Sequence, residues 1–419
     1  MTVLPAAFRV RSFRYQWPAD LLTSWAAEME TLILGWYVMV NTGSVVMLTA
    51  FASLQSLGTL MAPVFGVLGD RLGVRTMLCV MRATYALLAV FVMIPALAGH
   101  LTPMWVLVVA TLAGLVRPND LVMRNALIGE TIPPAHQMGA VGLSRASQDS
   151  ARIAGALAGA GLSAALGVGP SYAAVTLFYL TSLALTFGVA RSHPAPDPTR
   201  VARAAASSPY SDMKDGLVHV ATTPVLLATM LLAFIINVTA YPVTSGLLPY
   251  AARTIYMVDS TGLGWLVASF SCGALVGSIV VVASGGPRQP GRAMIVYAAM
   301  WYALLLAFGN ARSFGAGVVL LLVAGFVQSI AMISLMGTLL AAVEARFRTR
   351  VLAARQLAVY GMPIGLMAIG GLIERVGYAM TVSACCVTGL AVTLAIGVRW
   401  RGSVAPARVV LTPSRSRTL

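Results

Sequence analysis

The sequence predicts an all-α polytopic membrane protein with twelve transmembrane helices in two pseudo-symmetric six-helix bundles. Hydrophobic residues make up 58% of the 419 residues and charged residues only 10%, a composition that excludes a soluble globular domain. The apolar residues form runs of about twenty, the length at which a helix crosses a hydrocarbon core of about 30 Å. The net charge of +15 is spread singly between these runs, so it indicates membrane topology and excludes nucleic-acid binding.

Twelve apolar segments follow one another along the chain. They are expected at 19–40, 45–66, 77–98, 102–122, 142–166, 171–190, 221–248, 261–283, 293–311, 313–338, 352–373 and 377–399. Connections on one side of the membrane hold most of the basic residues, as at Arg200 and Arg348, whereas the other side holds only Arg253, Arg312 and Arg375. Because short basic loops stay in the cytoplasm, we expect both termini there.

One connection differs in composition from the rest. Residues 192–220 are rich in Pro, Ala, Ser and Asp and contain the only lysine, Lys214, which is typical of a linker. This cytoplasmic linker separates an N-terminal six-helix bundle at 1–191 from a C-terminal one at 221–400, as expected for internal repeats. Residues 401–419 form a basic cytoplasmic tail. Arginine far outnumbers lysine, which is typical of a GC-rich bacterial genome, so we expect a bacterial inner-membrane protein.

A charged turn at residues 66–75 interrupts the apolar sequence after the second segment. It contains Gly66, Gly69, Asp70, Arg71, Gly73 and Arg75. Glycines allow two helices to approach closely, the aspartate can cap the next helix, and the arginines suit the cytoplasmic edge of a membrane.

This turn resembles the G-x-L-G-D-R-x-G-R-R loop between the second and third spans of the major facilitator superfamily. Val74 stands where that family usually has a basic residue. The resemblance implies a transporter in which Asp70 and Arg71 form ion pairs in the outward-open state and lose them when the inner gate opens. Asp120 and Glu130 lie near the same edge, and we expect them to form gating pairs with arginines such as Arg71, Arg75 or Arg124.

Other stretches are similar to the branch of the superfamily that contains the bacterial enterobactin exporter and macrolide-efflux permeases. They are residues 118–133, which resemble that branch's loop after the fourth span, and residues 151–155, 348–351 and 361–365. This resemblance implies export of siderophores, drugs or related metabolites. Residues 285–292 keep only part of the pattern of the glycine-rich turn. This difference predicts that the two halves contribute unequally to closing the inner gate.

The fifth segment places charged and small residues on one helical stripe: Gly142, Arg145, Asp149, Arg152, Ala156 and Gly159. Arg145 and Asp149 are four residues apart and can pair. Arg152 would then be free to bind an anionic group such as a carboxylate or a catecholate. A structural network near the gate is the alternative. The stripe also resembles the superfamily's antiporter signature, although alanine replaces its proline.

Two carboxylates lie in the first segment. Glu28 shares a polar stripe with Thr31 and Gly35, whereas Glu30 points elsewhere. Burial disfavours the charged form of a carboxyl group, so such a group can take up and release a proton as access alternates. The proton-coupling candidates are Glu28, Glu30 and Asp149, with Glu28 favoured. The alternative to proton coupling is a structural role, in which either glutamate pairs with an arginine or a hydroxyl.

Polar and aromatic residues inside other segments are candidates for contact with a substrate. With Arg152 and Arg145, they are Trp25, Asn119, Asn237, Tyr241, Gln328 and Tyr360. Interhelical hydrogen bonding and packing are their alternative roles. Three prolines, Pro242, Pro249 and Pro363, can kink the seventh and eleventh segments.

Together these features predict a secondary transporter that exports a small amphipathic organic molecule in exchange for protons. The sequence has no phosphate-binding Gly-x-x-x-x-Gly-Lys loop and no catalytic constellation, so neither ATP-driven transport nor an enzyme is expected. The four cysteines lie in apolar segments, and we expect no metal and no cofactor. The expected partners are the substrate, protons and the lipid bilayer, and the expected state is a monomer. Uptake or facilitated diffusion of a metabolite is one alternative, and a non-transporting sensor or assembly subunit is another.

Overall fold

The computed structural model describes residues 8–61, 65, 68–69, 72–190, 217–343 and 348–404, and every regular element among them is a helix. The first half of the chain forms α2 (Arg11–Thr42), α3 (Val45–Leu54), η1 (Leu57–Met61), α5 (Val74–Leu97), α6 (Pro103–Val116), η2 (Arg117–Asn119), α7 (Asp120–Thr131), α8 (Pro134–Leu166) and α9 (Val168–Phe187). The second half forms α12 (Pro224–Thr239), α13 (Tyr241–Ser245), α14 (Leu248–Tyr250), η3 (Ala251–Ile255), α15 (Ser260–Ser284), α16 (Pro290–Asn310), α17 (Phe314–Ala342), α18 (Arg348–Val359), α19 (Gly361–Val376), α20 (Tyr378–Arg399) and α21 (Arg401–Val404). The expected all-α class is confirmed for these residues.

Local sequence sets several of the helix ends. Gly43 adopts φ +63° and ends α2, a backbone conformation that glycine reaches without a steric penalty. Ser44 then starts α3, because its hydroxyl accepts a hydrogen bond from the Met47 amide at 3.3 Å. Asp259 starts α15 in the same way, through the Gly262 amide at 2.9 Å. These caps fix two of the short turns between long helices.

Eight helical stretches in the described residues are long and apolar enough to cross a membrane, which supports a multi-pass membrane protein. Two shorter apolar helices, Val45–Thr59 and Pro224–Thr239, accompany them. Helices α2 and α8 are also long but lie outside the eight, because they carry charged residues along their length. Charged residues at membrane depth are costly, so these two helices are the first place to seek a functional site.

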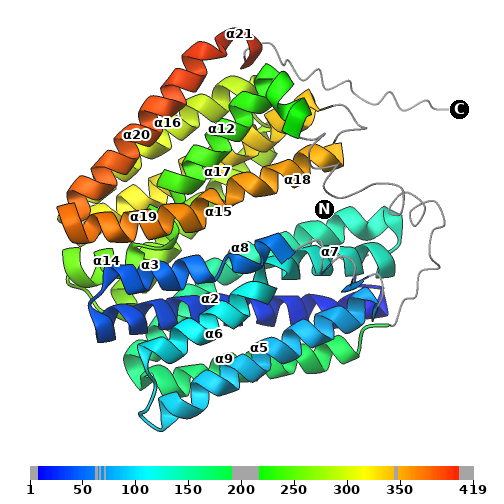
Figure 1. Cartoon of the computed structure of the whole chain (residues 1–419). Coiled ribbons are helices and arrows are strands. Elements are labelled where there is room, and N and C mark those ends of the chain that lie inside the picture. Colours follow the sequence, from blue (N-terminus) through cyan, green and yellow to red (C-terminus); the bar gives the residue numbers. More distant parts are fainter. Residues whose placement is uncertain are drawn as a thin grey trace, which may run out of the picture.

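The helices form two groups that follow the order of the sequence (Figure 1). Helices α2 to α9 lie in the lower part of that view, and α12 to α20 lie in the upper part. In the first group α2 packs on α8 and α9, and α5 packs on α9; in the second, α17 packs on α15 and α16. One core lies within the first group and buries Tyr172 and Tyr179. The other is centred on the second group, where Trp301 and Tyr302 are buried, and extends to Ala156 and Ala160 of α8.

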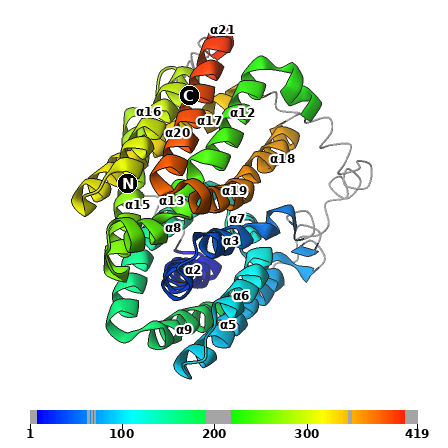
Figure 2. The ribbon, with the colours of Figure 1, turned by 60° about the vertical axis from the view of Figure 1, so that its left-hand side comes forward.

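The two groups meet through α3 with α19 and α8 with α15 (Figure 2), and α2 also contacts α14. Small residues allow close approach: a Cβ added to Gly264 of α15 would lie 2.5 Å from the Cβ of Ala160 on α8. Hydrogen bonds also join the groups. The Ser53 hydroxyl donates to the Pro363 carbonyl at 3.2 Å, and the Ser260 hydroxyl donates to the Ala160 carbonyl at 3.4 Å.

The fourth span is longer than the sequence suggested, and the loop expected at 118–133 is mostly helical. Pro118 lies in the 3₁₀ turn η2, after which α7 continues from Asp120 to Thr131. A proline in the first turn of a helix loses no hydrogen bond, so it does not end the helix. The acidic side chain of Asp120 in the first turn of α7 is also favourable at a helix N-terminus.

The seventh and eleventh spans are interrupted near the expected prolines. After α12 ends at Thr239, Pro242 and Pro249 lie in the first turns of α13 and α14, and the π-helical η3 follows. In the eleventh span, α18 ends at Val359, four residues before Pro363. A proline ring clashes with the carbonyl four residues earlier, which accounts for this break.

The predicted linker and tail lie largely outside the described residues. Of the linker at 192–220, only residues 217–220 are described, and they belong to a helical stretch at 217–222. Of the tail at 401–419, Arg401–Val404 are helical. The Ala190 amide donates to the Ser12 hydroxyl at 3.3 Å, so the end of the first half lies beside the start of α2.

Candidate functional site

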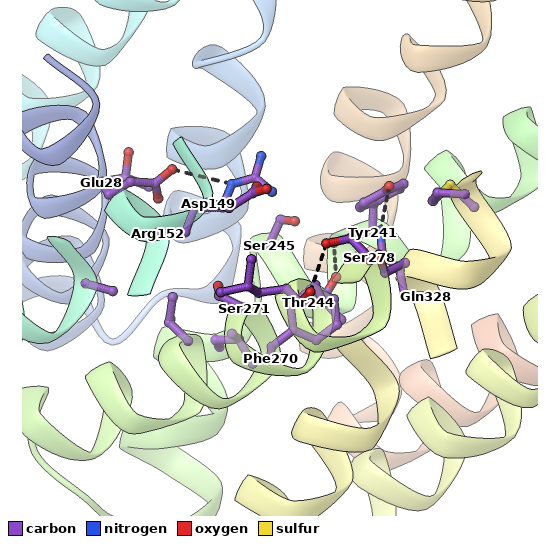
Figure 3. Close-up of a pocket in the computed structure, with 18 of the residues that line it drawn as sticks. Glu28, Asp149, Arg152, Tyr241, Thr244, Ser245, Phe270, Ser271, Ser278 and Gln328 are labelled. Atoms are coloured by element: carbon purple, nitrogen blue, oxygen red, sulfur yellow. Dashed lines mark hydrogen bonds and ion pairs between the residues drawn. The ribbon is translucent and has the colours of Figure 1, made fainter. Parts of the chain in front are cut away.

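A cavity of about 1070 Å³ lies between the two groups of helices. Its walls come from α2, α3 and α8 of the first group and from α13, α14, α15, α17 and α18 of the second. Figure 3 shows charged side chains on one side of the cavity and hydroxyl, amide and aromatic side chains on the other. Because both halves contribute walls, any relative movement of the halves changes the shape of this cavity.

The cavity reaches toward one end of the molecule. Its lining includes Gly142 and Arg145 near the start of α8 and Val282 near the end of α15, which is the end where α2 starts. At the opposite end the halves are packed together. There Pro249 lies 3.6 Å from a Cβ added to Gly35, and α3 contacts α19. The structure is therefore closed on the side away from the central link.

The charged wall centres on an ion pair between Glu28 of α2 and Arg152 of α8. The Arg152 Nε atom lies 3.7 Å from the Glu28 Oε1 atom, and the side chains are 54% and 35% exposed. Thr31 and Gly35 line the cavity on the same face of α2, as the predicted polar stripe requires. Glu28 is thus partly accessible and only loosely paired.

The predicted pairing of Arg145 with Asp149 is wrong for this structure. Both residues line the cavity, yet the ion pairs between described residues include none between them. Their four-residue spacing permits contact but does not require it, because each long side chain can turn toward the cavity instead. Arg152, which we expected to be free, is the residue that is paired, because α2 brings Glu28 beside it.

The opposite wall contains Tyr241 of α13 and Gln328 of α17, which were both predicted. The Gln328 amide donates to the Tyr241 hydroxyl oxygen at 3.0 Å. The Tyr241 ring also packs edge-on against the ring of Trp301, with centroids 5.4 Å apart. This support fixes the phenol at the edge of the cavity, where Figure 3 shows it.

Arg355 of α18 is a third cavity arginine, and it was not among the predicted site residues. It lines the cavity together with Arg145 and Arg152. Its Nε atom is buried and has no hydrogen-bond partner among the described residues. A lone arginine inside an apolar segment was the available signal in the sequence, but only the fold brings α18 opposite α8.

The small residues of the α8 stripe pack this helix against its neighbours on both sides. A Cβ added to Gly155 would lie 3.1 Å from the Glu28 Cβ, and one added to Gly159 would lie 3.0 Å from the Met29 Cα. Ala156 and Ala160 face Gly264 of α15. The stripe therefore holds α8 between α2 and α15, which is what places Arg152 beside Glu28.

Glu30 lies in a separate buried cluster within the first half. It is 5% exposed and forms an ion pair with Arg117. The Tyr172 and Tyr179 hydroxyls donate to its two oxygens at 3.1 and 2.8 Å. In this state Glu30 faces away from the cavity, as the helical position predicted, and all its close partners belong to the first half.

A second buried cluster in the first half joins α2, α5 and α7. Asp20 forms ion pairs with Arg82 and Arg124, and Arg124 also pairs with Asp120. Arg82 is fully buried in the middle of an apolar helix. Asp120 and Arg124 thus form a pair of the predicted kind, but it lies within one half and does not join the two. Sequence reasoning missed Asp20 and Arg82, although charged residues in apolar segments were a visible signal.

The glycine-rich turn is only partly described. Gly66, Asp70 and Arg71 lie outside the described residues. Gly69 lies against Met123, and Gly73 adopts φ +82° just before α5. The Arg75 guanidinium donates to the Phe187 carbonyl at 2.6 Å, so it binds the end of α9 and not Asp120. Glu130 is half-buried near the end of α7.

Four predicted substrate contacts do not line the cavity. Trp25 packs against Phe178, Asn119 is buried and donates to the Gly58 carbonyl, and Asn237 donates to the Ala233 carbonyl one turn earlier. Tyr360 lies at the break between α18 and α19. Among the described residues, no group of three or more His, Cys, Asp or Glu side chains is placed to hold a metal ion.

Two helical halves that enclose a charged cavity, closed at one end, define a membrane transporter. A model of the Major Facilitator Superfamily matches residues 19–365. The chain therefore belongs to this superfamily. No curated protein sequence matches it.

Solved structures of transporters share this fold over nearly the whole chain. The nucleoside transporter NupG superposes with a TM-score of 0.70 at 11% identity, covering 93% of this chain and 99% of its own. The human organic anion transporter MFSD10 gives 0.62 at 14% identity, covering 92% and 99%. An inward-facing, unoccupied bacterial homologue of the human lysosomal transporter Spinster gives 0.66 at 12%, covering 93% and 96%. At these identities the likeness concerns the fold alone.

Proposed function

We propose that this protein is a proton-coupled secondary transporter that exports a small amphipathic organic molecule by alternating access. The observation that carries the proposal is the partly exposed Glu28–Arg152 ion pair in a cavity between two halves of a membrane fold. A titratable group that faces a cavity at membrane depth marks an ion or substrate pathway. The membership of the superfamily supports transport as the activity.

The proposed architecture has twelve spans, six in each half, with the link and both termini on the cytoplasmic side of a bacterial inner membrane. The proposed domains are 1–191 and 221–400, joined by 192–220 and followed by the tail at 401–419. In this orientation the cavity opens to the cytoplasm. In the outward-open state, the turn that contains Gly66, Asp70 and Arg71 would close the cytoplasmic side.

Glu28 is the proposed proton carrier, because it is exposed to the cavity and its partner is 3.7 Å away. Asp149 also lines the cavity and is the second candidate. Glu30 is the third candidate, but its paired and buried position suits a structural role better. Arg117 interacts electrostatically with Glu28 and forms the ion pair with Glu30.

Two features support different directions of transport. The small-residue surface of α8, together with the resemblance to the enterobactin and macrolide exporters, supports proton exchange and export. The Glu28–Arg152 pair supports uptake as the second candidate function if the substrate is an anion. An anion at Arg152 and a proton on Glu28 would break the same pair, so each would favour binding of the other, as co-transport requires.

The test uses proteoliposomes that contain trapped pyranine, a fluorescent pH indicator. Addition of ethidium or dansylglycine to the wild-type protein is expected to move protons, with protein-free liposomes as the passive background. Internal alkalinisation on probe entry indicates exchange, and acidification indicates co-transport. We expect Glu28→Gln to abolish the proton signal, because the amide cannot titrate.

The matched control is Glu374→Gln, since Glu374 is exposed near the end of α19 and does not line the cavity. This variant should retain the wild-type signal. Proton movement that is unchanged in Glu28→Gln would remove Glu28 from the mechanism. Absence of any probe-driven proton movement in the wild type would contradict proton coupling.

A further inference from the structure

We propose that the cavity binds an organic anion whose acidic group is held between the arginines of α8 and Arg355 of α18, with Tyr241 as a hydrogen-bond donor. The proposal rests on the proposed function only in treating this cavity as the transport site. It applies to either direction of transport. Because α8 belongs to the first half and α18 to the second, the ligand would bridge the two halves of the molecule.

The charged residues that line the cavity leave a positive excess. The charged residues that line the cavity are three arginines, Arg145, Arg152 and Arg355, and two carboxylates, Glu28 and Asp149. Three positive and two negative groups leave a formal excess of one positive charge. An anion bound in the cavity would neutralise this excess.

The Nε atom of Arg355 is buried without a hydrogen-bond partner among the described residues. The ion pairs between described residues include neither Arg355 nor Arg145. Arg355 is half-buried, and a guanidinium with an unpartnered buried Nε atom can donate bidentately to a carboxylate, sulfonate or phosphate.

Tyr241 lines the same cavity as these arginines. The Tyr241 side chain is close enough to Arg145, Arg152 and Arg355 to interact electrostatically with all three. Its oxygen already accepts a hydrogen bond from Gln328 at 3.0 Å, so its own hydrogen remains available to a ligand. One neutral donor and three cations, supplied by α8, α13 and α18, thus line the same cavity.

Apolar side chains in the cavity wall are suited to the remainder of the ligand. Phe51 of α3, Phe270 of α15 and Met332 of α17 also line the cavity. Aromatic and thioether side chains favour an apolar body, so the anion should be organic and not a small inorganic ion. An organic cation fits less well, because Arg152 already opposes Glu28 and Arg117 lies near the same carboxylate.

The test compares three fluorescent probes that share one aromatic body: dansylglycine, an anion; dansylglycinamide, neutral; and dansyl-ethylenediamine, which carries an amine. Binding to the full-length protein in nanodiscs is measured at neutral pH, with empty nanodiscs as background. We expect dansylglycine to bind at least about tenfold more tightly than dansylglycinamide, since a charge-assisted bidentate pair is strong.

Arg355→Gln should bring the two affinities to within about threefold by weakening dansylglycine alone. Unchanged binding of dansylglycinamide to this variant shows that the cavity is intact. Arg355→Lys should keep part of the preference, because it keeps the charge. Arg375→Gln, at an exposed arginine near the end of α19, is the matched control and should keep all of it.

Equal binding of the anionic and neutral probes, tighter binding of the amine, or no binding of dansylglycine would overturn the proposal. None of these binding results measures proton coupling, which is read separately from the pyranine signal in proteoliposomes. Conversely, a preference for dansylglycine without proton movement would support the anion site and contradict the proposed function.

Discussion

Glu28 and Glu30 are two residues apart, yet the helix gives them different environments. At 3.6 residues per turn, this spacing directs the side chains to nearly opposite faces of α2. Glu28 faces the cavity beside Arg152, and Glu30 faces the core beside Arg117 and two tyrosines. These environments suit the proposed proton carrier at position 28 and a structural role at position 30.

This difference predicts opposite results for two matched substitutions. Glu30→Gln leaves Arg117 without its counter-charge in a buried site and should destabilise the protein by about 3 kcal/mol. Glu28→Gln removes a loose, partly exposed contact and should change stability by less than about 1 kcal/mol. Thermal unfolding of both variants in detergent measures the difference. Equal stability of the two variants would contradict the structural role of Glu30.

Protonation of Glu28 should also control the binding of an anion. The charged groups near Glu28 are Arg152 and, more distantly, Arg117, and Asp149 lines the same cavity. A proton on Glu28 removes the carboxylate that competes for Arg152, so the affinity for dansylglycine should rise as pH falls. Glu28→Gln should hold the affinity near its low-pH value at every pH. A wild-type affinity that is independent of pH, or that falls with acidification, would show that Glu28 does not compete for Arg152.

At the scale of elements, the contact between α8 and α15 determines how the halves close. Because a Cβ on Gly264 would come within 2.5 Å of the Ala160 Cβ, Gly264→Ala must push the helices apart. Overpacking of this kind costs about 1 to 3 kcal/mol. We expect a lower unfolding temperature and greater access to the cavity from the closed end.

Gly161→Ala is the control for this prediction, since a Cβ at Gly161 meets nothing within 4 Å. It should leave stability unchanged or raise it slightly through the higher helix propensity of alanine. Thermal unfolding and labelling of a cavity cysteine from each side measure both effects. A Gly264→Ala variant that behaves like Gly161→Ala would show that this contact does not hold the closed end.

The elements also show what the sequence can predict. Apolar runs predicted most of the helices, because membrane spans are local features of composition. The resemblance to the exporter branch implied a loop at residues 118–133, whereas most of this stretch forms α7. Helical periodicity separated Glu28 from Glu30 correctly. Arg355 and Arg152 line the same cavity because α18 packs opposite α8. No local sequence pattern predicts this packing.

At the scale of the whole molecule, the structure corresponds to one of the two states that the proposed alternating-access cycle requires. The cavity reaches the end of the molecule where α2 starts, while α3 and α19 pack together toward the other end. Alternating access requires that these contacts separate while the open end closes. The central claim is therefore that the α3–α19 contact must break once in each cycle.

A reversible disulfide between Thr49→Cys of α3 and Gly370→Cys of α19 tests this claim most directly. A Cβ at Gly370 would lie 3.2 Å from the Thr49 Cβ, close to the separation of about 3.5 to 4.5 Å found in disulfides. The background replaces the native cysteines, which are Cys79, Cys272, Cys385 and Cys386. Transport of dansylglycine or ethidium is measured in proteoliposomes before oxidation, after oxidation and after reduction.

Oxidation is expected to stop transport and to leave binding of the probe from the open end intact, and reduction is expected to restore transport. The two single-cysteine variants should be insensitive to oxidation. Full transport by completely cross-linked protein would contradict alternating access through this cavity.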